Sequence, residues 1–433
     1  MNLCGRCAFE TLLRAKRMAA MSFEDRCKAA KCRVSGVQGM VPILDLGNMP
    51  HADGLLTRET LNKPEAKWPL ELAFAPESKL VQITETVDPT ILFGADYPYF
   101  SSFSDAWLKH CRENAQNLIK TRKLGKSSFV VELASNDGYM LKNFVEAGIP
   151  VQGIDPAPGP AKAAEKIGVP TICDFFTLDM AKRMAKEGKR ADVVIGNNVM
   201  AHVADTNGFV QGIREILKDD GTTSIEAPYL RDMIEHCEFD TIYHQHLCYF
   251  SVLSADYLFR KNGLFLNHVE HLPTHGGSMR YYAGRKEAVQ DSVKRFLAEE
   301  RDLGMDKPGY YRGFATMVKN LGLTMRSILA DIKRQGRSIA AYGAAAKGAI
   351  MINYLGADTK TLDFVVDKNI HKQGRYMPGM HIPILAPEEL VKRQPDYCVI
   401  LPWNFKDEIM QQQAEYRKKG GRFIVPVPTP VIV

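Results

Sequence analysis

The clearest pattern of hydrophobic and polar positions in the chain is a short apolar run that ends in a polar turn. Phe129–Leu133 is apolar and β-branched, which is typical of a buried parallel strand. The run breaks at Ala134–Gly138, and apolar residues at helical spacing resume over Tyr139–Val145. A strand, a tight polar turn and a helix predict the first crevice of a doubly wound sheet, where ligands lie beyond the carboxyl end of the strand.

Strands and helices continue to alternate after this unit. The pattern predicts helices near Gly159–Ile167 and over Thr206–Leu217, and a turn at Asp219–Gly221. Alternation at this spacing indicates an α/β fold with a doubly wound, mainly parallel sheet. The predicted strands, of which the last two are edge strands, are Val151–Ile154, Pro170–Cys173, Ala191–Gly196, Thr223–Ala227, Leu266–Glu270 and Ser278–Ala283.

The segments on either side of this central unit have different patterns. Residues 21–108 are rich in Pro, Gly and turn residues and predict a small irregular domain with short extended pieces, the clearest at Pro42–Pro50 and Leu80–Ile83. A helix over Ser104–Lys123 leads into the central domain. Residues 287–334 predict a charged helical arm, broken at Pro308-Gly309. A second strand and turn at Ser338–Gly343 predicts a smaller Rossmann-like unit, with strands at Phe364–Asp367 and Tyr397–Leu401. The predicted domains are 21–108, 109–286 and 287–433, after an extension of uncertain status at 1–20.

Composition argues against several classes of function. The 433 residues include 56 basic and 50 acidic ones, and the resulting net charge of +6 is too weak and dispersed to favour nucleic acid. No run approaches roughly eighteen uncharged apolar residues, so no membrane span is expected. Nine scattered cysteines favour a reducing cytoplasm. The basic first twenty residues fit either a targeting helix or a start assigned too far upstream.

The first crevice also carries a candidate cofactor site. The strand after the turn ends in Asp155, twenty-three residues past Glu132, where a carboxylate can accept hydrogen bonds from both hydroxyls of a ribose. The turn lacks the G-x-G-x-x-G pattern of pyrophosphate-binding dinucleotide sites. A cofactor with ribose and adenine but no phosphate fits better, and S-adenosylmethionine is the candidate. The alternative is an ordinary strand–turn–helix unit with an aspartate after a strand.

Several stretches, in this order, resemble the sugar C-methyltransferase family, whose members methylate a carbon of nucleotide-linked keto-deoxysugars. The similarity runs from about Cys32 to the end of the chain. It implies a class I methyltransferase domain in the centre, a small zinc-binding type of domain before it and a Rossmann-like domain after it. The stretches are Leu44–Pro50, Tyr97–Ser102, Glu132–Gly138, Asn197–His202, Tyr243–His246, His275–Ser278, Tyr342–Gly348 and Pro395–Phe405.

The resemblance implies roles for the residues around the cofactor. Asn136, Asp137 and Gly138 would line the methionine end, Asp155 the ribose, and Asn197 the amino-acid portion. Asp174 and Phe175 would meet the adenine, although Asp174 could instead cap a helix over Thr177–Lys182. The remaining positions expected at the cofactor are Glu132, Ala134 and Pro156.

The resemblance also implies how a carbon could be methylated. A base must remove the proton next to a ketone while another group stabilises the enolate oxygen. His246 is the expected base and His202 the expected stabiliser, with Tyr243 and Tyr97 as hydroxyl partners; either histidine could instead be a structural hydrogen-bonder. Substrate contacts are expected at His244 and at His275, Gly276, Gly277 and Ser278, although these last four could instead form an ordinary turn. A cradle for the diphosphate is expected at Tyr342, Gly343, Ala344 and Lys347, although the small residues there could instead serve tight packing of a helix on the sheet.

Three departures from the family pattern change these expectations. Only Cys32 remains of two expected C-x-x-C pairs at 32–35 and 75–78, so no metal is expected. Ala134 stands where the family usually has Gly, which would crowd the cofactor. Gln245 stands where the family usually has Glu, and a neutral amide beside His246 would make it a weaker base.

The expected function is therefore S-adenosylmethionine-dependent methylation of a carbon next to the ketone of a nucleotide-diphosphate-linked keto-deoxysugar. Two alternatives remain: a methyltransferase for another acceptor, including one methylated at oxygen, and a non-catalytic relative that binds the cofactor. The expected partner is the nucleotide sugar, with neither nucleic acid nor membrane, and the sequence leaves the oligomeric state open.

Overall fold

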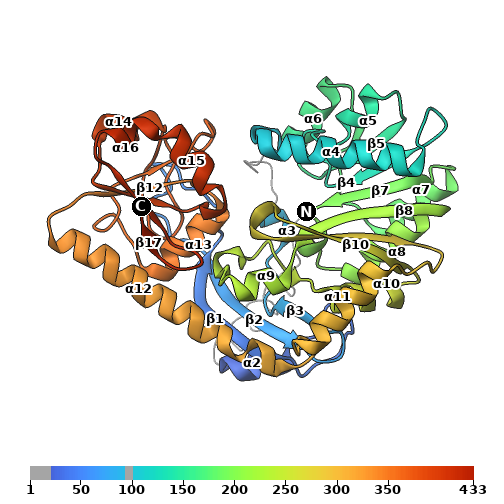
Figure 1. Ribbon diagram of the computed structural model, residues 1–433, viewed down its shortest axis with the longest axis horizontal. Coiled ribbons are helices and arrows are strands. Elements are labelled where there is room, and N and C mark those ends of the chain that lie inside the picture. The colour runs from blue at the N-terminus through green and yellow to red at the C-terminus, as the bar shows by residue number, and fades with distance from the viewer. Residues whose placement is uncertain (1–20, 93–100) are drawn as a thin grey trace.

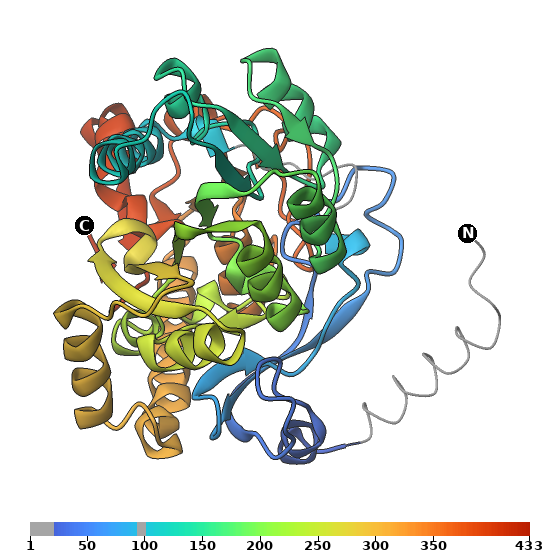
Figure 2. The same cartoon turned by 90° about the vertical axis from the view of Figure 1, so that its right-hand side faces the viewer.

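The computed structural model describes residues 21–92 and 101–433, and it contains three β-sheets (Figure 1). A seven-stranded sheet with its helices lies at the upper right of Figure 1, a six-stranded sheet at the left, and the N-terminal strands lie below and between them. In the turned view the blue N-terminal strands again lie along the lower side of the molecule, below the green helices (Figure 2). One continuous hydrophobic core connects all three sheets.

The seven-stranded sheet confirms the predicted α/β fold with a doubly wound centre. Its order is β10-β11-β8-β7-β4-β5-β6, parallel from β8 to β6 and antiparallel at β11 and β10. The first crevice opens at β4, because its neighbours β5 and β7 follow it on opposite sides. The strands are β4 Val130–Leu133, β5 Val151–Ile154, β6 Thr171–Ile172, β7 Ala191–Asn197, β8 Leu217–Pro228, β10 Phe265–Leu272 and β11 Ser278–Gly284.

Helices flank this sheet where the pattern predicts them, with two local differences. The helix after the first turn begins at Lys142 rather than Tyr139, and Asp219–Gly221 lies inside β8 rather than in a turn, next to an irregular register between β7 and β8. The helices of this region are α4 Asp105–Arg122, α5 Lys142–Glu146, α6 Pro158–Lys166, α7 Leu178–Lys186, α8 Thr206–Ile216, α9 Leu230–Glu235 and α10 Val252–Lys261. Its 3-10 turns are η1 Ser101–Phe103, η2 Met200–His202, η3 Phe239–Thr241 and η4 Thr274–Gly276.

The N-terminal region is more regular than its composition predicts. It forms an antiparallel sheet of order β1-β2-β3-β9, whose fourth strand comes from the middle of the chain. The elements are α2 Phe23–Ala29, β1 Val41–Pro50, β2 Lys67–Ala75, β3 Leu80–Ile83, α3 Pro89–Leu92 and β9 Cys248–Tyr249. Because β9 directly follows the Tyr243–His246 motif, this motif is joined to the N-terminal sheet.

The C-terminal region confirms the predicted arm and second Rossmann-like unit. Its sheet has the order β14-β13-β12-β15-β16-β17 and is parallel except for β17. In Figure 1 the long helix α12 runs from the N-terminal strands to this sheet. The elements are α11 Asp291–Asp302, η5 Pro308–Gly313, α12 Phe314–Arg334, β12 Ile339–Tyr342, α13 Ala346–Leu355, β13 Val365–Val366, β14 Ile384–Leu385, α14 Glu388–Arg393, β15 Tyr397–Ile400, η6 Trp403–Phe405, α15 Lys406–Gln412, α16 Ala414–Lys418, β16 Arg422–Val425 and β17 Val431–Ile432.

Among the described residues, no helix is both long enough and apolar enough to cross a membrane.

Candidate active site

The turn after β4 is held in an unusual backbone conformation. Ala134, Asn136 and Gly138 all have positive φ, at 56°, 48° and 79°. A Cβ at Gly138 would meet Ile167 and Val169 at 3.1 Å, a tight contact, and the positive φ of this residue also favours glycine there. Ala134 instead keeps a Cβ in the left-handed region, which costs about 1–2 kcal/mol relative to glycine.

Asp155 ties this turn to the end of β5. One carboxylate oxygen accepts from the backbone N–H of Asn136 and the other from that of Ala157, both at 2.9 Å. Burial raises the pKa of Asp155. Each oxygen retains a further lone pair, so the carboxylate can still accept from ribose hydroxyls.

The polar side chains of the turn reach back to the segment before α4. Asn136 Oδ1 accepts from the N–H of Ser101 at 2.9 Å, and Asp137 Oδ2 accepts from that of Ser102 at 3.1 Å. Both side chains are buried. The turn therefore anchors the end of the Tyr97–Ser102 motif, whose Tyr97 lies outside the described residues.

Buried polar atoms also meet at the carboxyl end of β7. Asn197 donates to the Tyr139 hydroxyl at 3.3 Å, while Oδ1 of Asn197 and of Asn198 are buried with no hydrogen-bond partner among the described residues. Glu132 is buried on the neighbouring strand β4, and burial raises its pKa well above the usual range. Orphaned acceptors at this edge fit a ligand that brings its own donors, such as the ammonium group of an amino acid.

The predicted adenine contacts lie at the open side of the crevice. Asp174 and Phe175 are exposed, and Cys173 Sγ lies 3.8 Å from the Pro156 carbonyl oxygen, which brings the ends of β6 and β5 together. Asp174 does not cap α7, because the side chain that accepts from this helix belongs to Thr177. The helix-cap alternative for Asp174 is therefore wrong.

His246 and Tyr243 form a hydrogen-bonded pair in the loop before β9. His246 Nδ1 lies 2.8 Å from the Thr241 carbonyl oxygen, which can only accept, so the proton is on Nδ1. Nε2 then accepts from the Tyr243 hydroxyl at 2.7 Å. The His202 ring lies 4.8 Å from that of His246, nearly perpendicular at 82°, and burial lowers the pKa of His202 to about 4.

The two residues between this pair face the N-terminal sheet. His244 is fully buried, with Nε2 3.3 Å from the Pro69 carbonyl oxygen, and burial lowers its pKa to about 4. Gln245 donates to Asp53 at 2.8 Å and lies 3.0 Å from His51. The buried placement of His244 does not support its predicted contact with substrate. The amide of Gln245 contacts His51 and Asp53 and not the His246 ring, which was its predicted partner.

The glycines of the His275–Ser278 motif lie against carboxylates of the protein itself. Gly276 and Gly277 have φ values of +101° and +136°. A Cβ on Gly276 would lie 2.5 Å from Glu238, and one on Gly277 would overlap Asp232. The positive φ values together with these close contacts favour glycine without any substrate. Ser278 is buried, and its hydroxyl donates to the Thr274 carbonyl at 3.1 Å.

The predicted diphosphate cradle is occupied in part by protein groups. Asp367 accepts from the N–H of Ala344 at 2.7 Å, where a phosphate oxygen was expected, and a Cβ on Gly343 would overlap Pro402. Tyr342, on the strand before it, is buried. Small residues at the start of α13 therefore serve tight packing at least as much as ligand binding.

Lys347, on the first turn of α13, faces the central domain. Its Nζ lies 4.8 Å from the centroid of the Trp403 ring, and Trp403 donates to Asp240 at 2.8 Å. Burial raises the pKa of Asp240 to about 6 and that of Glu238 to about 7, and the nearby Lys347 charge opposes both shifts. Lys347 thus lies close to two carboxylates.

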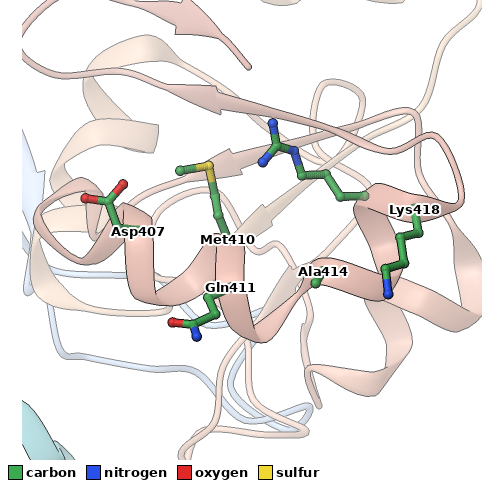
Figure 3. Close-up of a pocket in the computed structure, with 6 residues that line it drawn as sticks. Asp407, Met410, Gln411, Ala414 and Lys418 are labelled. Atoms are coloured by element: carbon green, nitrogen blue, oxygen red, sulfur yellow. The ribbon is translucent and has the colours of Figure 1, made fainter.

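Two cavities lie among the described residues, and only the second borders the predicted site, through His51. One of about 440 Å³ lies on α15 and α16 and contains none of the predicted site residues (Figure 3). The other, of about 290 Å³, is lined by His51, Lys63, Glu65, Trp68 and their neighbours in the N-terminal region. Sequence reasoning missed His51 and Asp53, although both directly follow the Leu44–Pro50 motif.

Comparison with known proteins assigns three segments of the chain. Residues 107–269 match a methyltransferase domain, residues 273–428 a C-methyltransferase C-terminal domain, and residues 32–93 a model described as a zinc-binding domain. The chain is 33% identical over 406 residues to the C-methyltransferase NovU of Streptomyces niveus, which covers 93% of this chain and 96% of that protein.

Two solved structures resemble parts of the chain. Magnesium protoporphyrin IX methyltransferase from Synechocystis PCC 6803 with bound S-adenosylhomocysteine is 14% identical and has a TM-score of 0.36, covering 46% of this chain and all of that one. A methyltransferase from Clostridium acetobutylicum ATCC 824 is 7% identical with a TM-score of 0.33, covering 42% of this chain and 92% of that one.

The residues at the zinc-binding positions do not fit a zinc ion. Cys32 Sγ lies 3.1 Å from Ser78 Oγ and accepts from the Ser35 N–H at 3.3 Å, and Cys32 and Ser78 are buried. The positions therefore come together, but they offer one thiol where a structural zinc site needs four ligands.

We expect purified protein to contain no stoichiometric zinc and to keep its melting temperature after treatment with a chelator. The reason is that a Cys–Ser hydrogen bond and apolar packing replace the metal as the local crosslink. Metal analysis that finds about one zinc per chain would contradict this expectation and would implicate Cys4, Cys7 and Cys27 as ligands.

We expect Ala134→Gly to tighten binding of S-adenosylhomocysteine, because it removes a methyl group and relieves positive φ at the turn. Stability should change by less than about 1 kcal/mol, since a flexible glycine also favours the unfolded chain. Calorimetry and thermal unfolding measure the two effects. Lys123→Gly is the matched control, because Lys123 has φ 51° at the end of α4; it should leave affinity unchanged. Equal affinity for Ala134→Gly would mean that the methyl group does not face the cofactor.

Proposed function

The chain belongs to the S-adenosylmethionine-dependent C-methyltransferase family, and on that premise we propose that it methylates the carbon next to the ketone of a nucleotide-diphosphate-linked keto-deoxysugar. The observation that carries the proposal is the Tyr243–His246 pair beside His202. An imidazole that accepts a hydrogen bond from a hydroxyl can take up the proton of that hydroxyl, and the ring of a second buried imidazole lies 4.8 Å away.

The cofactor supplies an electrophilic methyl group on a sulfonium. We assign its ribose to Asp155, its methionine end to Asn136, Asp137 and Gly138, and its amino-acid portion to Asn197. The orphaned Oδ1 of Asn197 supports this assignment, because a buried acceptor without a partner is costly unless a ligand fills it. Asp174 and Phe175 are left for the adenine at the open edge.

The geometry of the pair supports a route for proton removal. The Tyr243 hydroxyl proton passes to His246 Nε2 while Tyr243 Oη takes the proton from the substrate carbon, whose C–H electrons become the enolate double bond. The imidazolium then keeps its Nδ1–H on the Thr241 carbonyl, which accepts more strongly from a cation. We call the Thr241–Leu247 segment the catalytic loop.

His202 is suited to hold the enolate oxygen. Because burial lowers its pKa to about 4, the ring is neutral at neutral pH and can act as a hydrogen-bond donor without becoming an acid. A neutral donor in a buried site stabilises a developing oxyanion without first neutralising it.

A methyltransferase for a different acceptor is the second candidate. It is favoured by the carboxylates near Lys347 and by Asp367 on the N–H of Ala344, which compete with a diphosphate for the proposed cradle.

Calorimetry with S-adenosylhomocysteine, followed by titration with thymidine diphosphate, separates the candidates. Binding of both supports the nucleotide-sugar proposal. Binding of the cofactor product alone favours the other acceptor, and binding of neither contradicts both assignments.

A further inference from the structure

The catalytic loop directs its side chains to two sides. Tyr243 and His246 contact one another, whereas His244 between them contacts strand β2 and Gln245 contacts the loop after β1. The backbone is held at the end of the loop, where the N–H of Leu247 donates to the Ala201 carbonyl at 2.7 Å and the carbonyl of Leu247 accepts from the N–H of Ile83 at 3.1 Å. The orientation of the Tyr243–His246 pair is therefore coupled to contacts made by the intervening residues.

The contact of Gln245 has a defined chemistry. A carboxylate can only accept, so the amide NH₂ must face Asp53, and its second hydrogen then donates to Nε2 of His51. Burial lowers the pKa of His51, against the opposing effect of Asp53, and so favours the neutral ring that this bond needs. Gln245 is 2% exposed, so bulk water has little access to its hydrogen bonds.

We propose that Asp53 and His51 are positioning residues of the N-terminal domain, which fix the amide of Gln245 and through it the catalytic loop. An amide is required at 245 because Asp53 already supplies the negative charge of the pair. The inference rests on the proposed role of Tyr243 and His246 in proton removal.

The expected effect of Gln245→Glu is thereby reversed. When only residue 245 is considered, the neutral Gln245 makes His246 a weaker base, and a glutamate at 245 would make it a stronger one. With Asp53 in place, a glutamate would put two carboxylates within hydrogen-bond distance in a buried site, which destabilises the charged pair. Replacing both residues, as Asp53→Asn with Gln245→Glu, restores one amide and one carboxylate, and His51 can donate to the new carboxylate by moving its proton to Nε2.

The test compares the wild type, Asp53→Asn, Gln245→Glu and the double variant in methyl transfer to a keto-deoxysugar nucleotide. Substitutions at residues in contact have strongly non-additive effects. Each single variant should therefore lose about tenfold or more in kcat, and the double variant should recover to within about threefold of the wild type. Affinity for S-adenosylhomocysteine should stay unchanged in all four. Glu59→Gln, an exposed carboxylate of the same domain, is the control for the loss of one charge.

Additive losses without recovery, or single variants with wild-type kcat, would overturn the proposal. If the wild type methylates no keto-sugar nucleotide, the proposed function fails, and amide hydrogen exchange over residues 241–248 decides the inference instead. Faster exchange in each single variant, reversed in the double variant, supports it; equal exchange in all four overturns it.

Discussion

Replacing His246 by alanine is expected to lower kcat for methyl transfer by about a hundredfold or more, the low end for loss of a general base. The variant removes the acceptor of the Tyr243 hydroxyl proton, so Tyr243 can no longer take a proton from the substrate carbon. Because the ring also bonds the Thr241 carbonyl, the loop could loosen, and thermal unfolding must accompany the kinetics.

Two further variants separate chemistry from structure. Tyr243→Phe keeps the ring and removes only the hydroxyl, so it should lower kcat with little change in melting temperature or in affinity for S-adenosylhomocysteine. His268→Ala, on the edge strand β10, is the matched histidine control and should retain activity. If His246→Ala transfers methyl groups at nearly the wild-type rate, the assignment of the base is wrong.

Asp155→Ala is expected to weaken binding of S-adenosylhomocysteine by on the order of 2–3 kcal/mol, because the charged acceptor of two ribose hydroxyls is lost. The same carboxylate holds the N–H groups of Asn136 and Ala157, so the turn itself also loses support. Calorimetry measures the binding, and thermal unfolding measures how much of the effect is structural.

Asp192→Ala provides the matched control for Asp155. Asp192 also accepts from a backbone N–H, that of Phe129 at 2.7 Å, but it lies at the amino end of β7, the opposite edge of the sheet from the proposed cofactor site. It should lower stability and leave cofactor affinity unchanged. An unchanged dissociation constant for Asp155→Ala would place the cofactor elsewhere.

The sequence predicts the central sheet well because its parallel strands are buried on both faces. Runs such as Val130–Leu133 and Val151–Ile154 are short, apolar and bounded by turn residues, and the strands lie where these runs are. In the N-terminal sheet it predicts extended segments where β1 and β3 lie, but it does not predict β2. β2 begins Lys67-Trp68-Pro69 and contains the buried Glu71, a pattern without alternation, and its stability comes from partners distant in the chain.

The candidate site divides in the same way. The place of Asp155 beside the turn after β4 was predictable from its position after the second strand of the crevice, whereas its role toward a cofactor stays a prediction. The partners of Gln245 were not predictable, because Asp53 lies 192 positions earlier and no local pattern links the two. Motif resemblance placed Gly276 and Gly277 near a substrate, whereas their positive φ values and close contacts with Glu238 and Asp232 favour glycine there without one.

The pairing of β3 with β9 has a consequence for the order in which the enzyme can mature on the ribosome. Gln82 pairs with Cys248, so the strand that terminates the catalytic loop finds its neighbour only after a chain segment of more than 160 residues has been made. Closing so long a connection is entropically costly until the intervening domain has folded and shortened the distance. The nascent methyltransferase domain can therefore form its crevice first, and catalytic competence comes only when the much earlier β1–β3 strands dock onto β9.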